Sequence, residues 1–530
     1  MVSFRKSLMV VALLALCAGL VMAQTTNTTK VIVVRAEGVT EPIDNGGIVL
    51  NSTLPAAALP AGFLGTGFYN FTLFSNTTNI TSNPGKNDGA TGEITLNAGG
   101  GAVHGVINAG STSVTFTNVK ATPTAWVAGS PASFTVTIKG IRVNASLLTT
   151  GGPVVASGVS FTVFALPQDN LTPAALFATS NGGSSPIFTA ENVAYAISTL
   201  TVGATKDVVN KNFTFDQCAT PGGTLSNPTA TTPYFSPIFT INFTESYSKS
   251  FLSPGQEKDD SVDTTLVTNG TRLQATFTGF PAGTQLWVPN GVISGTVSAI
   301  LVLGPDADGS NGKLATKLGP NDYTAVTQGT PVVYEIFGSN ISGIGETLAV
   351  PVAVSFTVAN PALSAIAGSV SANYAPLSSV PGASATAAIP RFGSSPQTIA
   401  GGYYGINACT SQLLFPYVST GGGWDTGLAI SNTGLTPSST NALGGTCAFS
   451  FYAATGAPAA PVAFGAAGFG DTTAIASGTT AVGLASAAVP AGGAFTGYAY
   501  AVCNFKSSQG FAFPFAPEAR GYISAGYLSK

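Results

Sequence analysis

The pattern of hydrophobic positions along the chain is that of short β-strands separated by turns. Apolar runs such as Phe68–Phe74, Val159–Ala165 and 348–358 are rich in β-branched and aromatic residues, and clusters of Gly, Pro and Asn such as 83–89 interrupt them. No apolar repeat of 3.6 residues continues for three helical turns, so long helices are not expected. The pattern predicts an all-β chain built from tandem β-sandwich (Ig-like) domains.

Single strands show the alternation expected of a half-buried sheet. In the stretch 272–277, Leu273, Ala275 and Phe277 fall on one face, and polar side chains fall on the other. Successive side chains of a strand point to opposite faces of the sheet. One face of this strand is therefore expected in a core and the other in water.

Residues 1–23 carry the features of a secretory signal peptide. Arg5 and Lys6 precede the apolar run 8–21, and Ala23 stands before Gln24 at the expected cleavage point. No later stretch approaches the ~20 apolar residues that a transmembrane helix needs. We expect a cleaved signal peptide, an extracellular or cell-surface location, and no transmembrane segment.

Shifts in composition divide the remaining chain. Strand patterns fill 24–216, 217–375 and 403–530, whereas 376–402 is rich in Ser, Ala, Pro and Gly. We expect one or more N-terminal β-domains, a middle β-sandwich domain, a linker laid along a domain surface, and a C-terminal β-domain. The β-branched run Val31–Val34 is expected as the first strand of its own domain, and donation of this strand to a neighbouring subunit is the alternative.

Charged residues make up only 8% of the chain, against about 25% in typical soluble domains. A hydrophobic share of 45% argues against disorder. Charged side chains normally keep exposed sheet edges apart, so this composition favours self-association or contact with other cell-surface components. The excess of 22 Asp+Glu over 19 Lys+Arg argues against nucleic acid as a partner.

Four cysteines lie after the signal peptide. Large apolar side chains share a strand face with Cys447, and alanines share a face with Cys503, so the two strands can interdigitate in one core. Cysteines of an exported chain tend to form disulfides, and Cys447–Cys503 is the first choice. Cys218 and Cys409 form the remaining pair, although the sequence leaves three connectivities open.

Several strings in the C-terminal region are distinctive. LLFPYVSTGGGWDTGLAISNTG, GTCAFSFY and AVCNFKSSQGFAF, together with FTINFTES and GTRLQATFTGFPAG in the middle region, resemble a family of uncharacterised exported bacterial proteins. The resemblance covers roughly residues 210–530 and implies an exported, surface-associated protein with a cysteine-containing C-terminal β-domain. Gln509 replaces the histidine that usually precedes GFAF, and the resemblance implies no reaction.

Groups for enzyme chemistry are sparse. His104, the single histidine, lies among Gly residues with no Cys, Asp or Glu nearby, which is typical of a turn or surface residue. The CxxC, HExxH and GxSxG patterns are absent. The acidic stretch 257–263 offers carboxylates of the kind that glycosidases use, but the interposed Lys258 and the preceding Pro-Gly favour a solvated loop. No catalytic residue is expected.

An acidic turn is a weak candidate for a metal site. Asp306, Asp308 and Ser310 place alternate oxygen-bearing side chains on a Gly-rich turn, which resembles the start of a calcium loop. Lys317 stands where an EF-hand needs a glutamate, so a polar hairpin turn is favoured over a calcium site. Calcium is the only cofactor that the sequence suggests.

The Gly-rich turn 421–425 is a weak candidate for a ligand contact. Trp424 and Asp425 lie in it, and an exposed tryptophan can serve as a contact for a glycan. A packed or turn-capping tryptophan is the alternative.

These features favour a non-enzymatic, exported surface or extracellular structural protein that self-associates as the subunit of a filament, sheath or layer. An adhesin or glycan-binding surface protein is the alternative, and a hydrolase that uses carboxylates is a third hypothesis.

Overall fold

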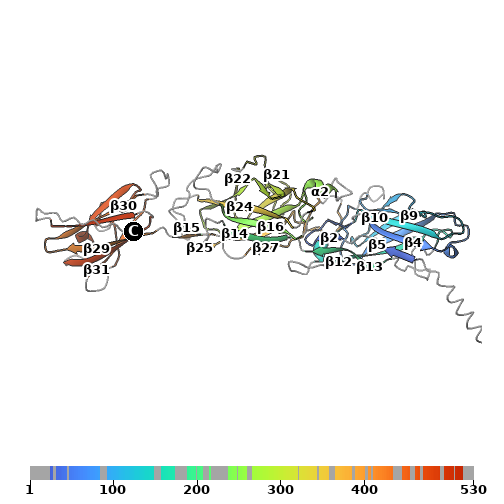
Figure 1. Cartoon of the computed structure of the whole chain (residues 1–530), viewed down its shortest axis with the longest axis horizontal. Coiled ribbons are helices and arrows are strands. Elements are labelled where there is room, and N and C mark those ends of the chain that lie inside the picture. The colour runs from blue at the N-terminus through green and yellow to red at the C-terminus, as the bar shows by residue number, and fades with distance from the viewer. Residues whose placement is uncertain are drawn as a thin grey trace, which may run out of the picture.

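The computed structural model of the chain consists of three β-sandwich bodies that follow one another along its long axis (Figure 1). It describes residues 24–27, 32–43, 47–83, 92–148, 157–173, 188–197, 200–206, 214–216, 237–246, 249–259, 266–319, 322–342, 345–356, 364–384, 388–399, 404–407, 410–433, 444–453, 460–465, 469–489, 494–505 and 508–516. The all-β fold of tandem sandwiches predicted from the sequence is confirmed. The signal peptide expected at residues 1–23 and the bounds expected for the domains remain predictions.

The N-terminal body is a sandwich of two sheets. One sheet has the order β1-β4-β10-β6-β7, and the other has the order β2-β13-β12-β5-β9-β8. A short pair, β11-β3, lies beside them. The bounds are β1 Gln24–Asn27, β2 Ile32–Arg35, β3 Glu41–Pro42, β4 Ile48–Leu54, η1 Ala56–Ala58, β5 Gly67–Ser75, β6 Thr95–Asn97, β7 Ala102–His104, β8 Val106–Ile107, β9 Ser113–Ala121, β10 Ala132–Lys139, β11 Arg142–Val143, η2 Ala145–Leu147, β12 Ser157–Pro167 and β13 Phe188–Ile197.

Alternation in the sequence explains the core of this body. In β5, Tyr69, Phe71 and Leu73 are fully buried, and the residues between them are partly exposed. β2, which the sequence placed at Val31–Val34, pairs in parallel with β13 of the same chain. It is therefore an ordinary strand of its own body in this structure.

The middle body packs a sheet of order β14-β16-β24-β18-β22 against a sheet of order β19-β20-β23-β17-β26-β27, with β21 paired to β20. A smaller sheet of order β15-β28-β25 lies near its end. The bounds are β14 Leu200–Lys206, β15 Thr214–Asp216, β16 Pro237–Glu245, α2 Pro254–Asp259, β17 Arg272–Thr278, β18 Thr284–Pro289, β19 Gly291–Ser294, β20 Val297–Leu303, β21 Lys313–Leu314, β22 Tyr323–Val326, β23 Pro331–Gly338, β24 Thr347–Phe356, β25 Ser364–Ala367, β26 Ser369–Ala375, β27 Gln397–Ile399 and β28 Tyr404–Asn407.

The core face expected for β17 is confirmed. Leu273, Ala275 and Phe277 are buried in the core of the middle body. The Phe277 ring lies 6.4 Å from that of Phe239 in the facing sheet, centroid to centroid. The expectation that the opposite face lies in water is wrong for Arg272, which is also buried.

The C-terminal body packs a sheet of order β29-β34-β31-β32 against a sheet of order β33-β30-β35. A disulfide joins Cys447 and Cys503 across the neighbouring strands β31 and β34, as expected from strand parity. The bounds are β29 Ser411–Thr420, β30 Asp425–Asn432, β31 Cys447–Ala453, β32 Val462–Ala463, β33 Thr479–Leu484, α3 Ala485–Ala488, β34 Phe495–Cys503 and β35 Ser508–Phe515.

The predicted packing of large against small side chains is confirmed in this body. Phe449 lies opposite Ala501, and Phe451 lies opposite Ala499, and all four are buried. The alanines leave room for the phenylalanine rings to fill the space between the sheets, which keeps the core dense.

The segment 376–399, here called the connecting segment, runs from β26 to β27 and contacts two bodies. Phe392 forms isolated bridges with Gly38 of the N-terminal body and with Leu377. Ile389 bridges Val267 of the middle body, and β27 completes one of its sheets. The residues that the sequence assigned to a linker thus bury apolar side chains between the bodies.

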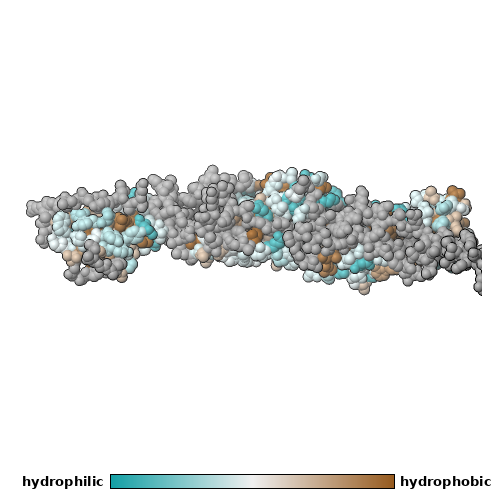
Figure 2. Space-filling model, turned by 60° about the horizontal axis from the view of Figure 1, so that its bottom comes forward, coloured by the Kyte–Doolittle hydropathy of each residue, from teal (hydrophilic) through white to brown (hydrophobic). Residues whose placement is uncertain are grey.

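Few charges lie on the described surface. On the face that Figure 2 shows, the coloured residues are largely white or pale teal, with smaller areas of strong teal and of brown. Within the described part of the chain, no helix is long and apolar enough to cross a membrane.

We predict that the disulfide stabilises the C-terminal body by about 4 kcal/mol, because the bridge closes a 56-residue separation and restricts the unfolded chain. Urea unfolding of residues 24–530, followed by the fluorescence of Trp424 in a variant with Trp126 and Trp287 replaced by Phe, measures this. Reductant and the Cys447→Ala/Cys503→Ala variant should lower the midpoint by the same amount. An unchanged midpoint would contradict the prediction.

Candidate functional site

The site with the most buried polar chemistry joins the N-terminal and middle bodies and is centred on Arg35. Arg35 ends β2 and is 1% exposed. Its Nε donates to Oε1 of Glu41 at 2.8 Å, and its Nη1 donates to Oε1 of Glu257 in α2 at 2.8 Å. Nη1 also donates to Oγ1 of Thr271 at 2.9 Å. One guanidinium therefore ties two bodies together, and these groups are called the Arg35 junction.

The connecting segment completes the Arg35 junction. The guanidinium carbon of Arg35 lies 5.0 Å from the ring centroid of Phe392, a cation–π contact. The Phe392 ring stacks on Tyr374 of β26, with centroids 4.6 Å apart. Three segments distant in sequence thus meet around a single side chain.

The charges of the Arg35 junction are unequal, because two carboxylates share one guanidinium. Burial raises the pKa of Glu41, and the neighbouring negative charge of Glu257 raises it further, while the charge and hydrogen bonds of Arg35 lower it. Loss of the guanidinium would leave both carboxylates buried without a counter-ion, which costs far more than the pair contributes to stability.

The carboxylate of Glu245 lies next to the Arg35 junction and holds the loop 249–251, which contacts Arg35. Ser250 of this loop accepts a 3.5 Å hydrogen bond from Nη1 of Arg35. Glu245, at the end of β16, accepts bonds from the backbone N–H groups of Phe251 and Glu346. Burial raises the pKa of Glu245 to about 7, and the charge of Glu346 raises it as well, against the effect of the backbone bonds.

Hydrogen bonds also tie the connecting segment to the N-terminal body. The carbonyl of Pro381 accepts from the side-chain amides of Asn79 and Asn144. The backbone N–H of Arg391 donates to Oγ1 of Thr40.

The guanidinium of Arg391 organises the connecting segment itself. It donates to Oγ of Ser378 and to the carbonyls of Val380 and Gly382. Burial lowers its pKa to about 10. Among the described residues no carboxylate pairs with it, so its charge is met by carbonyl dipoles.

The sequence missed the role of the acidic stretch. Glu257 is 1% exposed in a short helix, so the expectation of a solvated loop is wrong for this residue. Asp260 and Asp263 lie outside the described residues. A signal was present in Ser253-Pro254-Gly255-Gln256, because Ser253 and Gln256 exchange the bonds of a capping box.

The structure brings Asp306, Asp308 and Ser310 together in one turn. Ser310 donates from its backbone and from its Oγ to Oδ1 of Asp308, and its Oγ also lies 3.4 Å from Oδ2 of Asp306. Asn311 donates to the same oxygen of Asp306. Within the described ranges no group of three or more His, Cys, Asp or Glu side chains is placed to hold a metal ion. Calcium binding here remains a prediction.

A buried arginine occupies the inner side of this turn. Nη1 of Arg272 donates to the carbonyls of Gly309 and Asn311, and its Nε donates to Oε2 of Glu335. Carbonyl oxygens are among the ligands that a calcium loop would use. Two of them already accept from a guanidinium here.

The turn before β30 separates its two candidate residues. Trp424 is 41% exposed, and its backbone exchanges hydrogen bonds with that of Gly421. Asp425 is buried, and its carboxylate accepts from the backbone of Thr426 and from the backbone and hydroxyl of Ser486. The indole faces solvent, whereas the carboxylate holds α3 against β30.

The remaining residues that the sequence singled out are not part of the Arg35 junction or of the two turns described above. Cys218 and Cys409 lie outside the described residues, so their pairing remains a prediction. Nδ1 of His104, in β7, lies 2.6 Å from the carbonyl oxygen of Gly92.

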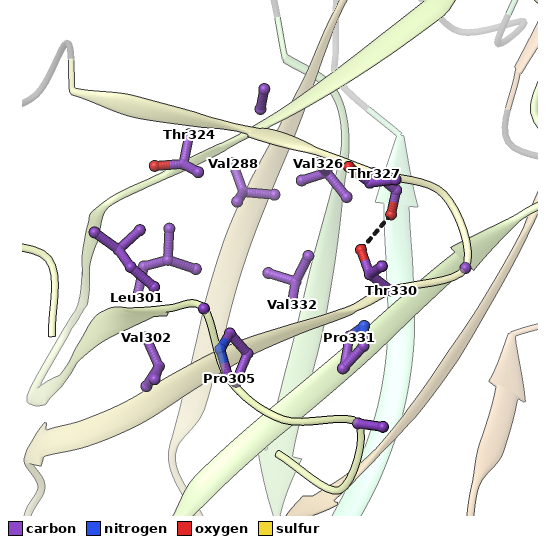
Figure 3. Close-up of a pocket in the computed structure, with 15 residues that line it drawn as sticks. Val288, Leu301, Val302, Pro305, Thr324, Val326, Thr327, Thr330, Pro331 and Val332 are labelled. Atoms are coloured by element: carbon purple, nitrogen blue, oxygen red, sulfur yellow. Dashed lines mark hydrogen bonds between the residues drawn. The ribbon is translucent and has the colours of Figure 1, made fainter. Parts of the chain in front are cut away.

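A pocket of about 460 Å³ opens between the two sheets of the middle body (Figure 3). Apolar side chains and threonines from β18, β20, β22 and β23 line it, and no ionisable side chain does. Thr330 at its rim donates to the carbonyl of Thr327 at 2.7 Å. Such a lining can exclude water, but it offers no acid, base or nucleophile with a shifted pKa.

No family model and no curated protein matches the chain. Among solved structures it is similar to the C-terminal domain of the Streptococcus agalactiae AgI/II polypeptide BspA, with 8% identity, 67% of this chain and 95% of that chain covered, and a TM-score of 0.22. The C-terminal domain of the Streptococcus pyogenes antigen I/II-family protein AspA is 8% identical, with 72% of this chain and 100% of that chain covered, and a TM-score of 0.26. BcpA, the major pilin subunit of Bacillus cereus, is 10% identical, with 85% of this chain and 94% of that chain covered, and a TM-score of 0.24. TM-scores this low assign no function to the chain.

We predict that Arg35→Met destabilises the joined bodies by about 3–5 kcal/mol, because Glu41 and Glu257 remain buried without a counter-ion. Trp126 reports on the N-terminal body and Trp287 on the middle body, so variants that keep one tryptophan each follow the two transitions separately. In the native chain both transitions should share one midpoint, and in Arg35→Met they should separate.

The matched control for this variant is Arg142→Met, which breaks a buried pair with Glu93 inside the N-terminal body. Because the Arg35 junction is intact in this variant, the Trp126 and Trp287 transitions should move to a lower midpoint together and should not separate. Shared midpoints in Arg35→Met would contradict a coupling role for the Arg35 junction.

We predict that Glu245 makes the middle body less stable as the pH rises. Its pKa of about 7 lies above the usual value of 4.5, so the folded state binds a proton that the unfolded state releases. The stabilisation is complete below pH 4.5 and is lost as the pH rises through 7. Thermal unfolding followed by Trp287 should show a smaller difference between pH 5.5 and pH 8 in Glu245→Gln than in the native chain. An equal difference in both proteins would exclude Glu245 as the titrating group.

Proposed function

We propose that the chain is an exported, non-enzymatic surface or extracellular structural protein, whose N-terminal and middle bodies form one stiff segment. The Arg35 junction is the observation that carries this proposal. A charged side chain that is 1% exposed and bonded to two bodies resists any relative motion of them, since motion would expose or unpair buried charges.

The distribution of buried polar groups supports a structural role. Arg35, Arg142, Arg272 and Arg391 each hold segments of the chain in place. They do not converge on the pocket of the middle body, whose lining is uncharged. Functional clefts usually bring together ionisable groups with shifted pKa values. Here the four buried arginines lie instead where segments of the chain join.

The surface supports self-association as part of the proposal. Among the described strands, β22 and β29 pair on one side only. Strands β29, β31 and β34 carry no charged residue. Edge strands with few charges pair readily with other chains. A filament, sheath or layer subunit at the cell surface is the form of the protein that we propose.

An adhesin is the second candidate. The exposed Trp424 beside the Gly-rich turn favours it. Loss of surface binding in Trp424→Ala, with assembly intact, would support an adhesin over a purely structural subunit.

Small-angle X-ray scattering and light scattering of residues 24–530 test the proposal. We expect an elongated particle whose N-terminal and middle bodies behave as one rigid unit, and a molecular mass that increases with concentration. In Arg35→Met the particle should become flexible, because the link between the bodies is lost.

The same Arg142→Met variant serves as the control for shape, since its broken pair lies within one body. A compact particle, or a strict monomer at every concentration that also finds no partner on cells, would rule the proposal out.

A further inference from the structure

The outer face of one sheet in the C-terminal body carries a row of tyrosines. Strands β29, β34 and β31 turn their cysteine, phenylalanine and alanine side chains into the core, so the alternate side chains point outward. We call these outward residues the tyrosine face: Gln412, Leu414, Tyr417, Tyr452, Tyr498, Tyr500 and Val502.

A bulge in β29 builds the row. The register shifts between Phe415 and Val418, so two residues of β29, Pro416 and Tyr417, lie opposite the single residue Tyr498. Both are exposed, and Tyr417 is 45% exposed. The extra residue brings a third tyrosine level with the pair on β34 and β31.

The pair on the other two strands is stacked. Tyr452 lies directly opposite Tyr498, and their rings are 4.8 Å apart and nearly parallel, at 5°. Tyr498 is 42% exposed. Stacking of one ring on the next restrains the side chains, so part of the entropy cost of ordering a platform is met before a ligand binds.

Polar groups accompany the rings. The hydroxyl of Tyr500 donates to Oε1 of Gln412 on the neighbouring strand. Tyrosine hydroxyls both donate and accept, and the amide of Gln412 adds donors. The face therefore combines apolar ring surfaces with hydroxyl and amide groups at their tips.

We propose that the tyrosine face binds an uncharged polysaccharide. The apolar C–H faces of sugar rings pack on aromatic rings, and sugar hydroxyls exchange hydrogen bonds with tyrosine and glutamine side chains. The three strands hold no Asp, Glu, Lys or Arg, so they offer no positive charge to pair with the carboxylates or sulfates of a charged glycan. An uncharged chain leaves no buried charge unpaired.

The size of the face favours a sugar chain over a protein. Its three strands span about 10 Å across, and the positions 412–417 span about 17 Å along β29, which gives an area on the order of 200 Å². A stable protein interface covers about 800 Å² on each partner. A short run of sugar rings fits the smaller area, and this site is independent of the proposed structural role.

Affinity electrophoresis of residues 24–530 tests the site. The gels contain soluble uncharged polysaccharides, namely a β-glucan, a mannan, a xylan and a galactomannan, with hyaluronan as the charged comparison. We expect at least one uncharged polysaccharide, and not hyaluronan, to retard the protein. Tyr498→Ala should weaken the retardation at least about tenfold, because it removes the central ring. Tyr498→Phe should retain most of it, because the ring remains.

Phe511→Ala is the matched control, since Phe511 is 41% exposed on the outer face of the opposite sheet, in β35. It should leave retardation unchanged. Retardation by no uncharged polysaccharide overturns the proposal, as does equal retardation of native protein and a Tyr498→Ala variant with native melting behaviour. Loss of self-association in Tyr498→Ala, without any polysaccharide binding, would assign the face to a second copy of the chain instead.

Discussion

The architecture of this chain depends on guanidinium groups taken out of water. Arg35, Arg142, Arg272 and Arg391 are all nearly inaccessible, although only 8% of the residues are charged. Arginine suits this use because its planar group donates several hydrogen bonds in fixed directions and stays charged when buried. Arg35, Arg142 and Arg272 donate to carbonyls or carboxylates of segments distant in sequence, whereas Arg391 donates within the connecting segment. A residue type that usually covers the surface here fixes how loops, turns and bodies meet.

The Arg35 junction shows why this arrangement matters for function. Sandwich domains joined only by a flexible linker move independently, and independent motion is the default for domains with small interfaces. Here α2, the end of β2 and Phe392 surround one cation, so displacement of either body would leave charges unpaired. The stiffness that we propose for the segment formed by the N-terminal and middle bodies therefore follows from an electrostatic constraint. The apolar contacts of Phe392 and Tyr374 add to it.

The C-terminal body is built differently, since its described residues are held by a disulfide and aromatic packing and form no buried ion pair. Phe449 contacts Phe415, Phe464 and Phe469 between the two sheets, and Cys447–Cys503 links adjacent strands. The disulfide and the aromatic contacts that stabilise this body lie in its core, so the outer faces of the two sheets are not needed to hold the sheets together. This separation allows one of them to carry the tyrosine row.

Strand and turn patterns in the sequence predicted the all-β class, and strand parity predicted the core face of β17 and favoured Cys447–Cys503 over the other pairings, because period-two alternation is a local property. The same parity puts Tyr498 and Tyr500 on the outer face of their strand. The alignment of Tyr417 with them depends on a bulge, and a bulge depends on pairing with another strand. Arg35 and Glu257 are separated by 222 positions, and no local pattern relates them. Their contact, and with it the burial of Glu257, was decided only when the tertiary structure brought β2 and α2 together, because an ion pair of this kind is specified by distance in space and leaves no period in the sequence.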